Sequence, residues 1–171
     1  MNFLGKRRLS IWLRQFLPLR WGMRLVAALI APRQPVGAVG AVFNDAGQVL
    51  LVEHMFRTDF PWGLPGGWVE QGEDPADAVQ REIEEELDLK VQIRQLLLSE
   101  PVGLTSFSTH PPHLGLAFYC RFVSGECTIT PEILSFEWVD PQVIKRELAP
   151  FQHKAIMLAQ KIFGQDRQIA S

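Results

Sequence analysis

The sequence has only two cysteines, Cys120 and Cys127, among its 171 residues. Two cysteines provide no disulfide framework, and their spacing matches none of the usual zinc-binding patterns. A reducing compartment is therefore the simplest expectation, because disulfide-dependent stability is typical of secreted proteins. We accordingly expect a cytoplasmic protein.

Long apolar runs are also missing, and none approaches the roughly 20 residues that a membrane-spanning helix needs. The chain has no internal repeat and no low-complexity tract. Gly37 and Gly40 lie in a strand-like segment, but no helix follows them, so the segment is not a dinucleotide-binding fingerprint. The length and the 47% hydrophobic composition fit one globular domain with a sizeable core.

Acidic residues are absent from positions 1 to 44, which carry seven lysines and arginines. Because the net charge of the whole chain is −2, the remaining residues carry a net charge of about −9. Charge of this distribution gives no nucleic-acid footprint outside the N-terminal segment. We therefore expect no nucleic-acid partner.

The basic N-terminal segment has apolar residues at helical spacing from Leu9 to Leu17, and residues 20–30 favour a second short helix after a break at Pro18. Arg14, Arg20 and Arg24 interrupt any signal-peptide core. Three interpretations stay open. The helices pack on the domain or on a second subunit, they lie on an anionic membrane surface as peripheral elements, or they form a cleaved targeting peptide. We expect residues 1–34 to form this extension and residues 35–171 to form the domain.

Beyond residue 34 the pattern of apolar residues predicts strands mixed with a few helices, which favours the α+β class. The predicted strands are residues 36–43, 48–54, 91–100, 113–123 and 133–139. Predicted helices cover residues 75–87, 141–148 and 151–163, with Pro150 expected to end the second of them. Residues 57–63 and 101–112 are expected to be loops.

The helix predicted at residues 75–87 carries two parallel lines of side chains. Val79, Ile83 and Leu87 form an apolar line, since they repeat at i, i+4. The other line contains three carboxylates at i, i+3 and i+4, which repel one another unless a divalent cation binds them. They are Glu82, Glu85 and Glu86. A solvated acidic face is the alternative interpretation.

The spacing around this helix resembles the signature of the Nudix hydrolases. Gly67 is followed after five residues by Glu73, and after seven more by REIEEELDL at positions 81–89. One fixed position differs, because Asp88 stands where the family has glycine. We expect this position to follow the last helical turn in a left-handed conformation, which aspartate tolerates at a small cost in stability.

The resemblance implies an α/β/α sandwich around a mixed sheet and a hydrolase that uses Mg²⁺ or Mn²⁺. It implies that the enzyme cleaves a phosphoanhydride bond in a nucleoside diphosphate linked to another moiety. Either Glu82 or Glu85 is the candidate base, whereas Gly67, Glu73 and Arg81 are expected to be structural. The expected metal ligands are the backbone carbonyl of Gly66 and the side chains of Glu82, Glu85, Glu86 and Glu132. Glu132 lies outside the signature and has a solvated loop residue as its alternative.

Aromatic residues near the predicted loops are candidates for stacking on a nucleobase, namely Phe56, Trp62 and Phe107. Aromatic side chains are more often part of a core, and that alternative stays open for each of the three. For the whole domain the alternative function is a non-catalytic Nudix-fold module that binds a nucleotide or a partner. Such a module has no need of three intact carboxylates, which favours the enzyme.

Overall fold

The structure is a computed structural model that describes residues 17–30, 34–103 and 111–169. The chain divides into two compact units, Met1–Arg33 and Gln34–Ser171. In the first unit, helix α2 spans Leu17–Ile30, so it begins three residues earlier than expected and includes Pro18 in its first turn. Proline is tolerated there because the first N–H groups of a helix have no partner within it. In the described part of the chain, no helix is both long and apolar enough to cross a membrane.

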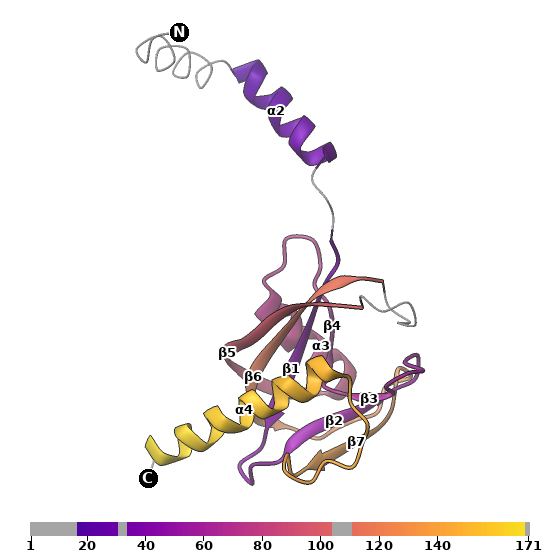
Figure 1. Ribbon diagram of the computed structural model, residues 1–171, viewed down its shortest axis with the longest axis vertical. Helices are drawn as coiled ribbons and strands as arrows, with labels where there is room; N and C mark the ends of the chain where they lie inside the picture. Colours follow the sequence, from indigo (N-terminus) through magenta and orange to yellow (C-terminus); the bar gives the residue numbers. More distant parts are fainter. Residues whose placement is uncertain (1–16, 31–33, 104–110, 170–171) are drawn as a thin grey trace. The chain divides into compact units, whose positions relative to one another are not determined.

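A seven-stranded mixed sheet forms the centre of the second unit (Figure 1). The path runs β3-β2-β1-β6-β5, while β4 pairs with β1 and β7 pairs with β2. Strands β1 and β6 are parallel, and the other pairs are antiparallel. The strands are β1 (Val36–Phe43), β2 (Val49–His54), β3 (Trp62–Gly63), β4 (Gly66–Trp68), β5 (Leu89–Val102), β6 (His113–Gly125) and β7 (Ile133–Val139).

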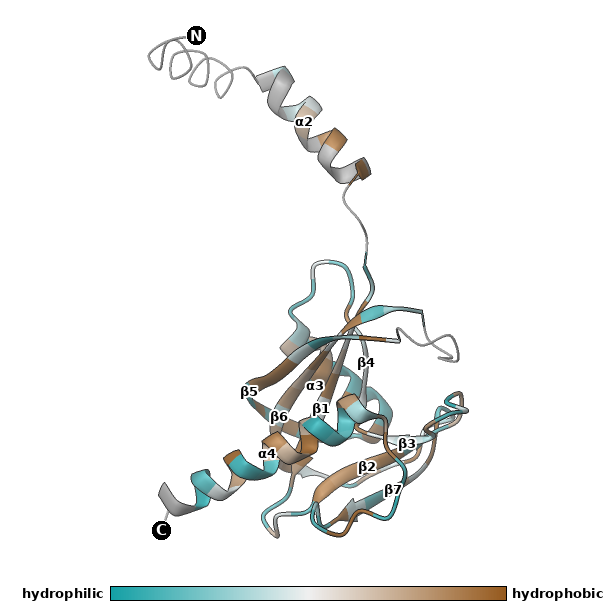
Figure 2. Cartoon of the chain, viewed as in Figure 1, coloured by the Kyte–Doolittle hydropathy of each residue, from teal (hydrophilic) through white to brown (hydrophobic). Residues whose placement is uncertain are grey.

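Alternation along β1 explains why both faces of the sheet are covered. Ala38 and Val42 belong to a buried cluster with residues of α3 (Pro75–Leu87), whereas Ala41 and Phe43 belong to a second cluster with residues of α4 (Pro150–Ile169). Successive side chains of a strand point to opposite faces, so one strand contributes to both cores. In Figure 1, α4 crosses in front of the sheet and α3 lies behind it, and Figure 2 shows the strands mostly in hydrophobic colours. The expected α/β/α sandwich is confirmed.

The segment before α4 differs from the prediction. Residues 141–148 form turns and bends where a helix was expected, and Pro150 is the first residue of α4 where it was expected to end a helix. Proline suits this first position because its fixed φ is helical and its missing N–H would have no intrahelical partner. Two short strands, β3 and β4, were also missed, because segments of two and three residues carry no periodicity.

Candidate metal centre

Helix α3 has well-defined ends. Asp74 caps its N-terminus by accepting a 2.8 Å hydrogen bond from the backbone N–H of Ala76, and Pro75 occupies the first turn. At the other end Asp88 has φ 55°, and its N–H donates to the carbonyl of Glu84 at 3.0 Å. The left-handed conformation expected at Asp88 is present. These caps fix where the carboxylates of α3 begin and end relative to the sheet.

Arg81 ties the start of α3 to the segment that precedes it. Its Nε and Nη2 donate to the two carboxylate oxygens of Glu73 at 2.8 and 3.1 Å, and Nη2 also donates to the carbonyl of Trp68 at 3.2 Å. The carboxylate of Glu73 also accepts from the N–H of Glu70 at 2.8 Å. The bond from Arg81, and then that from Glu70, lowers the pKa of Glu73 below its usual value. The segment from Trp68 to Glu73 is thereby held against the helix.

The glycine pair at 66 and 67 lets two backbones and a carboxylate approach closely. Gly66 has φ 135°, and a Cβ there would overlap the carbonyl oxygen of Ala38 and lie 2.8 Å from the Cα of Val39 on β1. A Cβ on Gly67 would lie 2.5 to 2.7 Å from the carboxylate atoms of Glu82. A side chain at 66 would have to displace the backbone of β1, whereas one at 67 would displace only the carboxylate of Glu82.

Glu86 is the carboxylate with the most perturbed surroundings. Its Oε2 is buried and has no hydrogen-bond partner among the described residues. Burial, and next the charge of Glu82, raise the pKa of Glu86 to about 7. The charge of Arg57 and a hydrogen bond from the Gly66 backbone oppose this rise. Glu82, Glu86 and the Gly66 backbone are therefore neighbours.

The Glu85 side chain is more exposed than that of Glu82. Its side chain is 63% exposed and accepts a 3.3 Å bond from Nη1 of Arg81, which also donates to Glu82 at 2.9 Å. Across the described residues, no three His, Cys, Asp or Glu side chains are arranged as a ready-made metal site. Glu82 and Glu85 thus share one donor of Arg81, and the convergence of Glu82, Glu85 and Glu86 on one metal ion stays a prediction.

The remaining predicted residues lie in different surroundings. Glu132 is exposed, its carbonyl accepts a 2.9 Å bond from the N–H of Met55, and its charge contributes to the raised pKa of Glu86. Phe56 is 72% exposed in the loop after β2. Trp62 is 8% exposed within the α4-side core, with the Arg146 guanidinium 4.2 Å from its ring centroid, a placement that favours the core alternative. Phe107 lies outside the described residues.

Sequence reasoning missed Arg57, whose charge interacts with Glu86. It also missed Gln152, whose Oε1 accepts a 2.9 Å bond from the N–H of Leu64 just before the glycine pair. Neither residue belongs to the 67–89 signature, and their proximity depends on the placement of α4 on the sheet. No local pattern in the sequence marks either of them.

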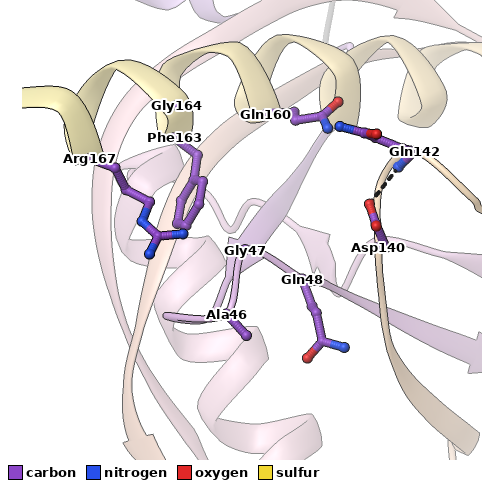
Figure 3. A pocket seen from close by; sticks show the side chains of 9 residues that line it. All are labelled: Ala46, Gly47, Gln48, Asp140, Gln142, Gln160, Phe163, Gly164 and Arg167. Atoms are coloured by element: carbon purple, nitrogen blue, oxygen red, sulfur yellow. Dashed lines mark hydrogen bonds between the residues drawn. The ribbon is translucent and has the colours of Figure 1, made fainter.

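A pocket of about 700 Å³ lies elsewhere, between the C-terminal half of α4 and the β1–β2 turn (Figure 3). Phe163 and Arg167 of α4 line one side, and Asp140 and Gln142 line another, joined by a 2.9 Å bond from the Gln142 N–H to the Asp140 carboxylate. No residue of α3 or of the glycine pair lines this pocket. It is therefore separate from the carboxylates of α3.

The carboxylate group on α3 fits a hard divalent cation. Glu86 presents a buried oxygen that lacks a partner in the described structure, and burying a carboxylate without compensation is unfavourable. Mg²⁺ and Mn²⁺ prefer carboxylate and carbonyl oxygens, and Glu82 and Glu86 supply carboxylates beside the Gly66 backbone. A cation there would compensate the charge that burial and Glu82 make unfavourable.

Comparison with known proteins places the chain among relatives of one kind. A NUDIX domain family model matches residues 33–159. The chain is 33% identical over 118 residues to "Nucleoside diphosphate-linked moiety X motif 6" of Mus musculus, with 65% of this chain and 36% of that protein covered. It is 34% identical over 108 residues to "Nucleoside triphosphatase NudI" of Escherichia fergusonii, and the match covers 58% of this chain and 77% of that protein.

Among solved structures, the MutT NUDIX hydrolase from Burkholderia pseudomallei superposes with a TM-score of 0.65 at 25% identity, covering 74% of this chain and 98% of that one. The chain spans about a third of the length of the mouse relative. The similarity to that protein therefore concerns one domain of it.

Proposed function

The chain belongs to the NUDIX domain family, and we propose that it is a divalent-metal-dependent pyrophosphohydrolase. The bond cleaved is a phosphoanhydride in a nucleoside diphosphate linked to another moiety. The names of the relatives, a nucleoside diphosphate-linked moiety X protein and a nucleoside triphosphatase, support nucleotides as the substrate class. The cytoplasmic location expected from the two cysteines stays a prediction.

The observation that carries this proposal is the buried, unpartnered carboxylate oxygen of Glu86 beside Glu82 and the glycine pair. A structural acid would not be expected there, because burial of its charge is costly. Perturbed carboxylates gather at functional sites, where their environment is matched to a ligand or a proton. Glu82 and Glu86, whose charges make each other's ionisation unfavourable, both belong to the family signature.

The proposed roles follow from the geometry of the chain. The cation is held by Glu82, Glu86 and the Gly66 carbonyl. Two exposed residues, Glu85 and Glu132, are further candidate ligands. A bound divalent ion supplies charge neutralisation for the diphosphate and makes a nearby water more acidic. Glu82 or Glu85 accepts the proton of the attacking water. Glu73 and Arg81 position the turn before α3, and Arg81 also donates to the carboxylates of Glu82 and Glu85.

Replacement of Glu86 by Gln tests this function. We expect Mg²⁺-dependent hydrolysis of a panel of nucleoside diphosphate derivatives at alkaline pH to fall by about 100-fold or more, since a carboxylate ligand becomes a neutral amide. Asp77→Asn, on the exposed side of the first turn of α3, is the matched control and should keep wild-type turnover. Turnover of the Glu86→Gln variant near that of wild type would defeat the assignment. Mn²⁺ binding by wild type without turnover of any compound would favour the non-catalytic module.

For the N-terminal unit we propose contact with an anionic membrane surface. Five large apolar side chains of α2 are each more than half exposed, and Arg20 and Arg24 lie one turn apart in the same helix. On a helical wheel the two arginine positions lie about 40° apart. The apolar residues cover a separate arc of roughly 200°. A stripe that wide suits immersion in lipid better than packing against one helix. The five are Trp21, Met23, Leu25, Val26 and Ile30.

Vesicle sedimentation tests the membrane proposal. The protein should co-sediment with vesicles that contain phosphatidylserine and much less with pure phosphatidylcholine, because each basic residue adds about 1 kcal/mol of attraction to an anionic surface. Arg20→Gln combined with Arg24→Gln should reduce this binding. Equal sedimentation with both lipids, or a stable dimer with no lipid binding, would point to the second-subunit interpretation.

A further inference from the structure

Arg57 lies in the loop between β2 and β3, and this loop is held at both of its sides. The N–H of His54 donates to the carbonyl of Pro61 at 2.8 Å, which closes the loop. The N–H of Met55 donates to the carbonyl of Glu132 at 2.9 Å, which fixes the loop to the residue that precedes β7. The backbone around Arg57 is therefore anchored on the same side of the molecule as Glu132, whose charge acts on Glu86.

The Arg57 side chain reaches back over β3. A Cβ built on Gly63 would lie 2.9 Å from Nη1 of Arg57, and it would overlap the side-chain amide of Gln152. Gln152 is itself held by the hydrogen bond from Leu64. The bare Cα of Gly63 thus makes room for a guanidinium and an amide together, three residues before Gly66.

The Arg57 guanidinium is desolvated and close to Glu86, but it is not paired with it. Burial lowers the pKa of Arg57, and the charge of Glu86 opposes this shift. In the described ranges 17–30, 34–103 and 111–169, Arg57 makes no ion pair and no hydrogen bond. The five N–H donors of the Arg57 guanidinium therefore have no acceptor among the described residues, and its charge interacts with that of Glu86.

We infer that Arg57 is a substrate-binding residue whose guanidinium donates to oxygens of the diphosphate, opposite the cation held by Glu82 and Glu86. This inference rests on the proposed function. An arginine fork matches phosphate oxygens in a bidentate manner, and the bond is charge-assisted. Gly63 and Gln152 are positioning residues, because they set where the guanidinium lies.

The competing account makes Arg57 a simple counter-charge for Glu86, and the two accounts predict different results. Removing a cation beside a metal site strengthens or leaves unchanged the binding of a divalent ion, because like charges repel. Removing a phosphate ligand weakens the binding of a diphosphate. A variant without Arg57 should therefore keep Mn²⁺ and lose diphosphate if Arg57 binds substrate.

The experiment titrates the full-length protein with Mn²⁺ by electron paramagnetic resonance, and then titrates the Mn²⁺-loaded protein with methylenediphosphonate by calorimetry. Arg57→Gln should bind the diphosphonate about 10- to 100-fold more weakly, as expected for the loss of a charge-assisted hydrogen bond. Its Mn²⁺ dissociation constant should be unchanged or lower. Arg94→Gln removes an exposed arginine of β5 and is the matched control, with no change in either titration.

Two further variants keep the test independent of folding. Gly63→Ala leaves the charge of Arg57 in place but displaces its guanidinium, so diphosphonate binding should weaken while Mn²⁺ binding persists. Arg57→Lys should give an intermediate loss, because an ammonium group lacks the fork. Wild-type diphosphonate affinity in Arg57→Gln, or a tenfold loss of Mn²⁺ affinity in that variant, would overturn the inference. Failure of the wild type to bind Mn²⁺ would instead overturn the proposed function from which it starts.

Discussion

The two adjacent glycines before α3 have different structural tasks, although each is required for lack of a side chain. Gly67 leaves space for the end of a flexible carboxylate, that of Glu82. Gly66 leaves space for the backbone of β1 and has a positive φ. A methyl group at 67 can push a side chain away, whereas a methyl group at 66 would have to move a strand.

We therefore predict that Gly67→Ala keeps its melting temperature but binds Mn²⁺ about 10- to 100-fold more weakly, a range typical of disturbed metal shells. Gly66→Ala should lose about 3 kcal/mol or more of stability through strain and overlap with β1. Thermal melting and Mn²⁺ titration of both variants measure this difference. Equal melting temperatures for the two variants would contradict the distinction between them.

Glu86 makes stability depend on pH, and the sign follows from its raised pKa. The folded state binds the proton of this carboxyl more tightly than the unfolded state does, since the pKa is about 7 when folded against an ordinary value of 4.5. The stabilisation is fully present below the ordinary value and is lost as pH rises toward the folded value. At pH 8 the ionised, buried Glu86 opposes folding unless a cation compensates it.

In buffer with a chelator, Glu86→Gln should therefore be more stable than wild type at pH 8, by about 2 kcal/mol. The difference should shrink toward zero near pH 4.5. Added Mn²⁺ should make the wild type more stable than Glu86→Gln at pH 8, because only the wild type binds Mn²⁺ tightly. Urea unfolding at both pH values measures these changes. A variant less stable than wild type in chelator at pH 8 would show that Glu86 has a structural partner.

At this scale the Nudix resemblance implied a structural role for Glu73 and Arg81, and their side chains are joined by a 2.8 Å hydrogen bond. It did not predict that Nη1 of Arg81 donates to both Glu82 and Glu85. A helical wheel places side chains on a face but does not include competition from a neighbouring cation. Arg57 could not be predicted for a different reason, since its surroundings come from β3, α3 and α4.

At the scale of elements, α3 shows how far local signals reach. Its bounds at residues 75–87 match the prediction because a capping residue, a proline and an apolar line all agree. The C-terminal region lacked such agreement. Pro141 and Pro150 both suit a helix start, and only the placement of α4 on the sheet decides between them.

The end of α3 gives a prediction at this scale. Asp88→Gly should raise the free energy of unfolding by about 1 kcal/mol, because glycine relieves the left-handed strain and an anion is removed from the negative end of the helix dipole. Asp88→Asn removes the charge but not the Cβ and should gain less. Urea unfolding with parallel Mn²⁺ titration is the measurement, and metal affinity should not change. A loss of stability in Asp88→Gly would show that the aspartate makes a contribution beyond its conformation.

At the scale of the whole molecule, the described core belongs to one unit. Every buried hydrophobic residue among the described ones lies between Ala38 and Phe163. None of them belongs to the described residues of α2, and positions 1–33 carry all seven basic residues of the N-terminal segment. The division at residue 34 stays a prediction about independent folding, suggested by the change in charge.

We predict that a fragment of residues 34–171 melts within a few degrees of the full chain and binds Mn²⁺ with the same affinity. It should no longer sediment with phosphatidylserine vesicles, because it has lost α2 and its net charge is about −9. Calorimetry and vesicle sedimentation of the fragment and the full chain test both statements. A fragment that unfolds or aggregates would show that the N-terminal residues complete the domain.

The most direct test of the central claim is an anomalous difference map from a crystal soaked in Mn²⁺ at pH 8. We predict a peak about 2.1 Å from carboxylate oxygens of Glu82 and Glu86 and from the Gly66 carbonyl, the distance expected for a small hard cation. A map without a peak at α3, or with one only in the pocket beside Asp140, would contradict the claim that these carboxylates form the metal centre.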